Sequence, residues 1–162
     1  MIQILFRRQT PELDQLAGYL DAAQHVFIQG QYDVSLDVAA FDVRAEVVTE
    51  DEILQAAYPD GCNAIEHREE YSLDQMIADI ERVLTIRREY WNPEFGGVPN
   101  KIESNLRRGY WNRLRACFPI DDARIVKLGW DVPFVNIGEG FTFVLYSTEP
   151  CRCLLLVGNV CD

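Results

Sequence analysis

The order in which two hydrophobic periods occur along this chain is the feature that most constrains its fold. Near both ends, apolar residues alternate with polar ones or run continuously, as in β-strands. Between residues 49 and 117 they recur every three or four positions, as in amphipathic helices. A regular strand-helix-strand alternation is absent, so a wholly parallel sheet is not expected. The 162 residues are about the length of one domain. We therefore predict a single α+β domain over residues 1–162, with N-terminal strands, central helices and a C-terminal antiparallel β-meander.

The first 48 residues are predicted to form three strands and one helix. Ile2–Phe6 and His25–Gln29 are apolar runs that indicate short strands. Between them, Thr10-Pro11 is typical of a helix start. This helix would carry four apolar side chains on one stripe, namely Leu13, Leu16, Ala17 and Leu20. Tyr32–Val48 alternates as a half-exposed strand, and a phase slip at Ala39-Ala40 predicts a bulge or a turn there.

Two capping boxes and one further cap locate the central helices. Thr49 with Glu52 predicts a short helix over Glu50–Tyr58, and Ser72 with Gln75 predicts a longer one. The apolar stripe of the longer helix is Met76, Ile77, Ile80, Val83, Leu84 and Tyr90. Asn100 is expected to cap a third helix. Its apolar stripe is Ile102, Leu106, Tyr110, Leu114 and Cys117.

The acidic excess is concentrated at one end of the chain. The sequence holds 26 acidic and 15 basic residues, a net charge of −11, and residues 1–81 hold 17 acidic and 4 basic residues. Such a charge argues against a general nucleic-acid or membrane-surface binder and favours a basic protein partner. The predicted partner-binding residues are Asp33, Asp37, Asp42, Glu50, Asp51 and Glu52. The alternative is that the glutamates complement their helix dipole and the aspartates solvate an ordinary strand face.

A basic segment that also contains aromatic residues offers a second hypothesis. Residues 82–115 carry eight basic and three acidic side chains. The basic residues are Arg82, Arg87, Arg88, Lys101, Arg107, Arg108, Arg113 and Arg115, and the aromatic ones are Tyr90, Trp91, Tyr110 and Trp111. Arginines beside aromatic rings can hold RNA through phosphate contacts and base stacking. The net negative charge of the chain opposes this, and arginines on helices often pair with nearby acids.

Cysteine and histidine suggest two kinds of chemistry. Cys62 and His67 are a nucleophile and a base within one segment, so a small enzyme or ligand-binding domain that uses them, or an aromatic-lined pocket, is the alternative function. Cys151, Cys153 and Cys161 supply three thiols, but a structural zinc site needs four ligands. We therefore predict no metal site, no cofactor and no catalytic residue.

Five cysteines are an odd number and favour reduced thiols over a closed disulfide framework. The N-terminal residues lack the order of a secretory signal, and no apolar run is long enough to span a membrane. We expect a cytoplasmic protein that does not bind membranes.

The last third contains three β-type runs, Arg124–Leu128, Phe141–Tyr146 and Cys151–Val157. The sequence from Phe134 to Tyr146, continued by Leu154–Asn159, resembles the closing β-hairpin of small acidic bacterial immunity proteins, which bind and neutralise a cognate toxin. This resemblance implies an immunity protein that occludes the active surface of a basic toxin domain. It transfers no binding residue to this chain.

Overall fold

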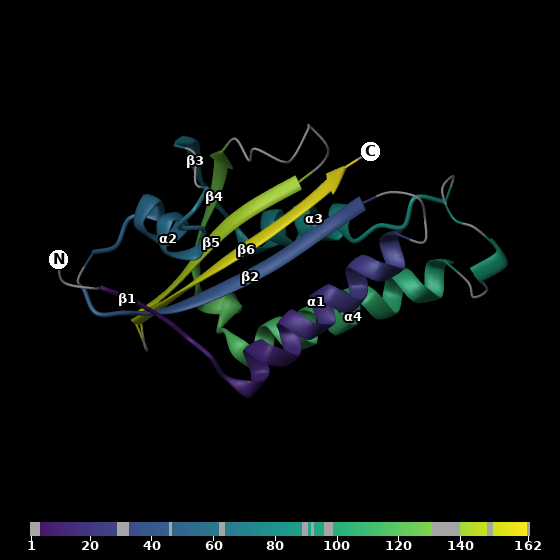
Figure 1. The fold of residues 1–162 in the computed structure, drawn as a ribbon, viewed down its shortest axis with the longest axis horizontal. Coiled ribbons are helices and arrows are strands. Elements are labelled where there is room, and N and C mark those ends of the chain that lie inside the picture. The colour runs from purple at the N-terminus through teal and green to yellow at the C-terminus, as the bar shows by residue number, and fades with distance from the viewer. Residues whose placement is uncertain are drawn as a thin grey trace.

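The fold is an antiparallel sheet with helices on both faces. The computed structural model describes residues 4–28, 33–45, 47–61, 64–88, 91, 93–95, 99–130, 140–148 and 151–161. Within these residues, six strands form one sheet in the order β1-β2-β6-β5-β4-β3, and every neighbouring pair is antiparallel (Figure 1). The predicted α+β class is confirmed, and so are the strands at both ends, the helices between them and the C-terminal meander β4-β5-β6.

The strands and helices have the following bounds. The strands are β1 (Leu5–Arg7), β2 (Asp33–Val43), β3 (Ile65–Tyr71), β4 (Arg124–Trp130), β5 (Gly140–Thr148) and β6 (Cys151–Cys161). The helices are α1 (Pro11–Ile28), α2 (Glu50–Ala57), α3 (Leu73–Val83) and α4 (Pro99–Cys117). Two single-turn 3₁₀ helices, η2 (Pro93–Phe95) and η3 (Ile120–Asp122), flank α4.

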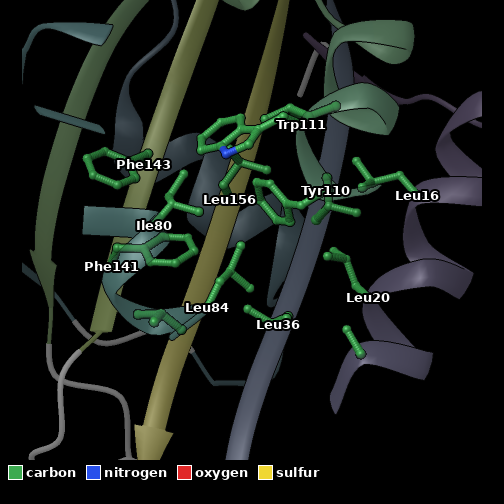
Figure 2. Close-up of a cluster of buried hydrophobic side chains, with 14 of the residues drawn as sticks. Leu16, Leu20, Leu36, Ile80, Leu84, Tyr110, Trp111, Phe141, Phe143 and Leu156 are labelled. Atoms are coloured by element: carbon green, nitrogen blue, oxygen red, sulfur yellow. The ribbon is translucent and has the colours of Figure 1, made fainter. Parts of the chain in front are cut away.

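The larger part of the core lies between one face of the sheet and the helices α1, α3 and α4. Alternate side chains of β2 point to this face, and they meet those of β5 and β6 and the apolar stripes of the three helices. Figure 2 shows Tyr110 and Trp111 of α4 packed among Ile80, Phe143 and Leu156. We call this side of the sheet the three-helix face.

The opposite side of the sheet is covered by the short helix α2, and we call it the α2 face. Ile53 and Leu54 of α2 are completely buried. They belong to a second cluster with the strand residues Leu5, Ala39, Phe41, Val126, Leu128, Val144, Cys153, Leu155 and Val157. The central strands therefore bury both of their faces. This explains why Leu154, Leu155 and Leu156 are consecutive in β6.

The predicted strand at His25–Gln29 is wrong, because α1 continues to Ile28. The reason is visible in the burial of Ala23 and Phe27, which extend the apolar stripe of this helix against the three-helix face. Tertiary packing therefore overrides the local β-propensity of the segment around Val26. Ala17, which was placed on the same stripe, is exposed. Gln29 lies outside the described residues.

The predicted bulge or turn at Ala39-Ala40 is also wrong. The pairing of β2 with β6 runs without a shift from Asp33 to Asp42. The apparent phase slip arises because Val38, Ala39, Ala40 and Phe41 are all buried. Here α2 covers the second face of β2, so the strand changes from half-exposed to fully buried without a change in backbone geometry.

The two capped helices are as predicted. Both capping boxes are formed, with Thr49 and Ser72 each accepting a hydrogen bond from the backbone N–H three residues on. The longer helix, α3, ends at Val83, so its stripe stops short of Tyr90, which lies outside the described residues. The strand β3 was not predicted, since the middle of its sequence consists of charged residues and histidine and lacks an apolar alternation.

Two glycines inside helices have opposite surroundings. A Cβ atom on Gly109 of α4 would lie 2.3 Å from the hydroxyl oxygen of Tyr19, which donates a hydrogen bond to the Leu106 carbonyl at 2.8 Å. Gly109 therefore allows α1 and α4 to approach closely. A Cβ on Gly18 of α1 would meet nothing within 4 Å. Gly18 thus carries the helix cost of glycine without a packing reason.

These surroundings predict opposite effects for one substitution. Gly18→Ala should raise the free energy of unfolding by about 0.5–1 kcal/mol, because alanine loses less backbone entropy in a helix. Gly109→Ala should lower it by about 1–3 kcal/mol, because the added methyl displaces Tyr19. Urea denaturation followed by circular dichroism measures both. If both substitutions raised the free energy of unfolding, the close contact between α1 and α4 at Gly109 would be contradicted.

Candidate protein-binding surface

The α2 face carries five of the six predicted partner-binding residues, and its geometry begins with the cap of α2. Thr49 accepts from the backbone N–H of Glu52 at 3.3 Å, and the Glu52 carboxylate accepts from the Thr49 N–H at 2.8 Å. The bond from the Thr49 N–H, together with a second from the Thr49 hydroxyl at 2.9 Å, lowers the pKa of the Glu52 carboxyl. The acidic first turn also complements the positive end of the helix dipole.

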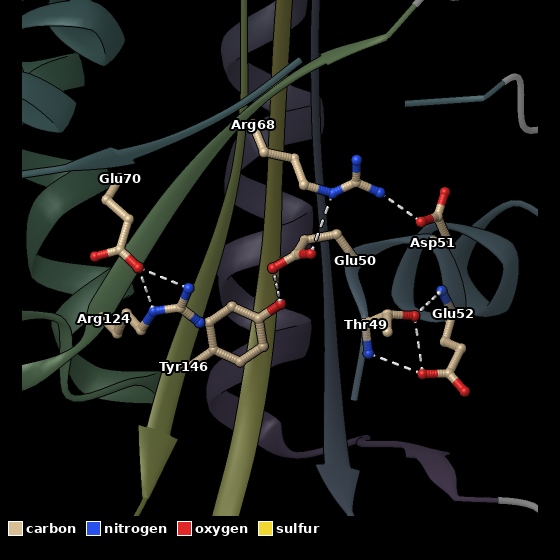
Figure 3. A network of polar contacts seen from close by, with 8 residues as sticks. All are labelled: Thr49, Glu50, Asp51, Glu52, Arg68, Glu70, Arg124 and Tyr146. Carbon is tan, nitrogen blue, oxygen red and sulfur yellow. Dashed lines mark hydrogen bonds and ion pairs between the residues drawn. The ribbon is translucent and has the colours of Figure 1, made fainter. Parts of the chain in front are cut away.

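A polar network holds α2 against the sheet (Figure 3). The Glu50 carboxylate is mostly buried and accepts a hydrogen bond from the Tyr146 hydroxyl of β5 at 2.6 Å. Its other oxygen lies 3.4 Å from Nε of Arg68 on β3, and the same guanidinium reaches Asp51 at 2.5 Å. Arg68 thus joins the edge strand to the first turn of α2. A mostly buried carboxylate needs such partners to offset its lost hydration.

A second arginine extends this network. Arg124 of β4 pairs with Glu70 of β3 at 2.6 Å, and its guanidinium carbon lies 5.3 Å from the centre of the Tyr146 ring. Burial, followed by the hydrogen bond and the charge of Glu50, raises the pKa of the Tyr146 hydroxyl. Tyr146 therefore remains a neutral donor to Glu50 throughout the physiological pH range.

The aspartates of β2 lie on both faces of the sheet. Asp33 and Asp37 point to the α2 face, where the Tyr58 hydroxyl donates to Asp37 at 2.7 Å. The Asp33 side chain is exposed and has no hydrogen-bond or ion-pair partner among the described residues. Asp42 points to the opposite side of the sheet, the three-helix face. There it pairs with Arg8 at 2.9 Å and with Arg152 at 3.3 Å.

The structure therefore brings together Glu50, Asp51 and Glu52, places Asp33 and Asp37 on the same face of the sheet, and separates Asp42 from them. Three of these carboxylates already have arginine partners. The role of the six residues in binding a partner stays a prediction. Sequence reasoning missed Arg68, since it lies in the strand that was not predicted. An arginine between glutamates just before a capping box was the available signal.

The described residues include only some of the cysteine and histidine candidates. His67 is exposed on β3, with its ring 3.5 Å from Glu69, and Cys62 lies outside the described residues. Burial raises the pKa of Cys117 to about 11 and that of Cys153 to about 12, so both thiols stay protonated. Cys151 is a free, exposed thiol. The described residues contain no group of three or more side chains placed to hold a metal ion.

Two of the four aromatic residues of the basic segment, Tyr110 and Trp111, are buried and so are not placed for RNA stacking. Tyr110 is 2% exposed and Trp111 is 8% exposed, and both pack in the core (Figure 2). The Trp111 ring N–H donates to Glu81 of α3 at 3.2 Å. Arg107 contacts Glu81 and Glu103 and donates to Thr85 at 2.7 Å. These residues join α3 to α4. In the part of the chain that the structure describes, no helix is long and apolar enough to cross a membrane.

The network predicts a specific role for the Tyr146 hydroxyl. Tyr146→Phe should lower the free energy of unfolding at pH 7 by about 1 kcal/mol, because Glu50 loses its donor from the sheet. A tyrosine in the unfolded chain has a pKa of about 10. Because the pKa of Tyr146 is raised in the folded state, its protonated hydroxyl stabilises the fold below about pH 10. This contribution to the free energy of unfolding is lost progressively as the pH rises above that value. The variant should therefore lose less stability than the wild type between pH 9 and 11.

Urea denaturation at several pH values measures both effects. Tyr58→Phe is the matched control, since it removes another hydroxyl bonded to a carboxylate on this face, but an exposed one. It should change the stability at pH 7 by less than about 0.5 kcal/mol. If Tyr146→Phe lost as much stability as the wild type between pH 9 and 11, the role assigned to the Tyr146 hydroxyl would be contradicted.

Comparison with known proteins adds one structural likeness. No protein-family model matches this sequence, and no curated protein matches it. Among solved structures, the crystal structure of citrus MAF1 is similar, with a TM-score of 0.60 and 14% sequence identity. The alignment covers 93% of this chain and 98% of the MAF1 chain. At this identity the likeness concerns the fold.

The fold likeness corrects the resemblance to bacterial immunity proteins. That resemblance rested on a β-hairpin pattern near the C-terminus, part of which, residues 131–139, lies outside the described residues. Alternating apolar residues around a glycine-rich turn are common to antiparallel hairpins in general, so the pattern did not discriminate between families. Since nearly the whole chain follows the fold of citrus MAF1, the interpretation as a toxin-neutralising immunity protein is wrong. The chain has a MAF1-like α+β fold.

Proposed function

We propose that this chain is a protein-binding repressor of the MAF1 type, with RNA polymerase III as its partner. The observation that carries the proposal is the extent of the likeness, which covers 93% of this chain and 98% of the MAF1 chain. A likeness over nearly the full length of both chains is stronger support than a shared hairpin or a shared helix pair.

The distribution of charge supports binding to a protein through the α2 face. Asp33, Asp37, Asp51 and Glu52 are exposed on this side of the molecule, and Asp33 has no partner among the described residues. Exposed carboxylates on one face steer a partner with a basic surface and raise its association rate. The buried Glu50 and its partners fix α2 in place, so these charges are held by a rigid element.

The proposal predicts repression of transcription. The purified chain, added to RNA polymerase III of its own organism on a tRNA gene, should reduce the transcript, with no effect on polymerase II. Asp33→Lys should weaken binding to polymerase III by about three- to tenfold, since it reverses a charge on the α2 face. Asp21→Lys makes the same change on the exposed side of α1 and serves as the control. An absence of both binding and repression at micromolar concentration would overturn the proposal.

A further inference from the structure

The helix α4 carries an excess of positive charge, although the whole chain has a net charge of −11. Its 19 residues include five lysine or arginine residues and a single acidic residue, Glu103. Glu103 is already used inside the fold, because it pairs with Arg107 at 3.3 Å and accepts a hydrogen bond from the backbone N–H of Ile86. The other basic residues of α4 therefore have no acidic partner within their own helix.

Three of these basic residues form one row on the outer side of α4. Lys101, Arg108 and Arg115 recur at intervals of seven residues, which is close to two helical turns, so their side chains leave the helix in nearly the same direction. All three are exposed, whereas Tyr110 and Leu114 on the opposite side of the helix are buried. We call Lys101, Arg108 and Arg115 the basic stripe. The polar residues between them that are also exposed are Ser104, Asn105 and Asn112.

The charges of the basic stripe are largely unbalanced within the described residues. Lys101 has no hydrogen-bond or ion-pair partner there, and Arg108 donates only to the neutral side chain of Asn105, at 2.7 Å. Arg115 reaches Asp121 at 3.4 Å, but both side chains are exposed, and such pairs contribute little to stability. A carboxylate from another molecule therefore has two free cations and one weakly held cation to bind.

The surroundings of the basic stripe favour a narrow occupant. The helix α1, which lies beside α4, contains three acidic residues and no lysine or arginine (Figure 1). The helix α3, which α4 also contacts through Arg107 and Trp111, contains three acidic residues and one arginine. A nucleic-acid duplex is wider than one helix, so its phosphates would approach these carboxylates. A single extended protein segment fits on α4 alone.

We propose that the basic stripe binds an extended acidic segment of a partner protein. Neighbouring cations of the stripe are about 10.5 Å apart along the helix. An extended chain advances about 10 Å in three residues, so carboxylates at every third position of the segment each meet one cation. Ser104, Asn105 and Asn112 supply side-chain donors for the carbonyl groups of the segment. This surface lies on the other side of the sheet from the α2 face, and it does not depend on which protein binds there.

Three synthetic peptides test the sign and the spacing of the charges. The first is acetyl-Gly-Glu-Ser-Gly-Glu-Ser-Gly-Glu-Gly-amide, the second has lysine in place of the three glutamates, and the third has the composition of the first with its glutamates consecutive. In NMR titrations of the ¹⁵N-labelled chain at low salt, the first peptide should give saturable shifts confined to residues 99–117. The lysine peptide should bind at least about tenfold more weakly, and the third peptide about threefold more weakly. Salt at about 0.3 M should weaken the binding of the first peptide, because it screens exposed charges.

Matched variants assign the binding to the basic stripe. Lys101→Glu and Arg108→Glu should each weaken the first peptide by about tenfold or more. Arg7→Glu makes the same change in net charge and serves as the control. Arg7 is exposed on β1, and its cross-strand neighbour Phe41 belongs to the α2 face, so it lies on the other side of the sheet. This variant should bind the peptide as the wild type does. Circular dichroism spectra identical to the wild type verify that the variants fold.

Several results would overturn the inference. They are equal binding of the glutamate and lysine peptides, shifts that lie outside α4, and wild-type affinity in both stripe variants. Tighter binding of a DNA duplex of about 20 base pairs to α4 would identify the occupant as nucleic acid instead. Self-association of the chain that Arg108→Glu abolishes would identify it as a second copy. Failure of the proposed function would leave these results unchanged, since no polymerase enters the measurements.

Discussion

A six-stranded sheet with two apolar faces must have both faces covered. In this structure the two faces are covered unequally, and the rest of the structure depends on this difference. Three helices cover one face, and their apolar stripes continue the core without a break. The other face has one helix of 8 residues. Burial of apolar area is the main favourable term in folding, so the second face is stabilised less by packing and more by specific polar contacts.

Those polar contacts explain why α2 is both acidic and firmly placed. Glu50 is drawn toward the sheet by Tyr146 and Arg68, while the next two carboxylates remain near the solvent. One helical turn thus supplies an anchor and a charged outer surface. The same face carries aspartates near the start of β2 and an apolar residue, Val43, at its end.

The sequence predicted the elements whose signals are local. The capping boxes at Thr49 and Ser72 and the apolar stripe of α4 depend on residues within one or two turns, and they appear where expected. Errors arose where the outcome depends on distant residues. Val26 and Phe27 belong to a helix because Phe27 packs in the core formed with distant residues, and β3 is a strand because it pairs with β4, more than fifty residues away.

The same difference between local signals and distant partners applies to the candidate site. The acidic residues of α2 were recognised from composition and spacing, but their partners were not, because Arg68 and Tyr146 come from strands that lie far apart in the sequence. A cavity of about 340 Å³ at one end of this face, lined by Val43, Tyr146 and Cys151 among others, is formed by the ends of several strands, and no local pattern marks it. The basic segment was recognised as unusual, but the burial of Tyr110 and Trp111 shows that these two rings serve packing.

The central pair of the sheet joins β2 to β6, whose residues are more than a hundred positions apart. Closing so long a loop is entropically costly and slows folding. During synthesis, β2 and β5 have no neighbour on their inner edges until residues 151–161 have left the ribosome. The inner edge of β2 therefore stays unpaired while the next hundred residues are made, and the growing chain depends on its surroundings to keep this edge from pairing with other chains.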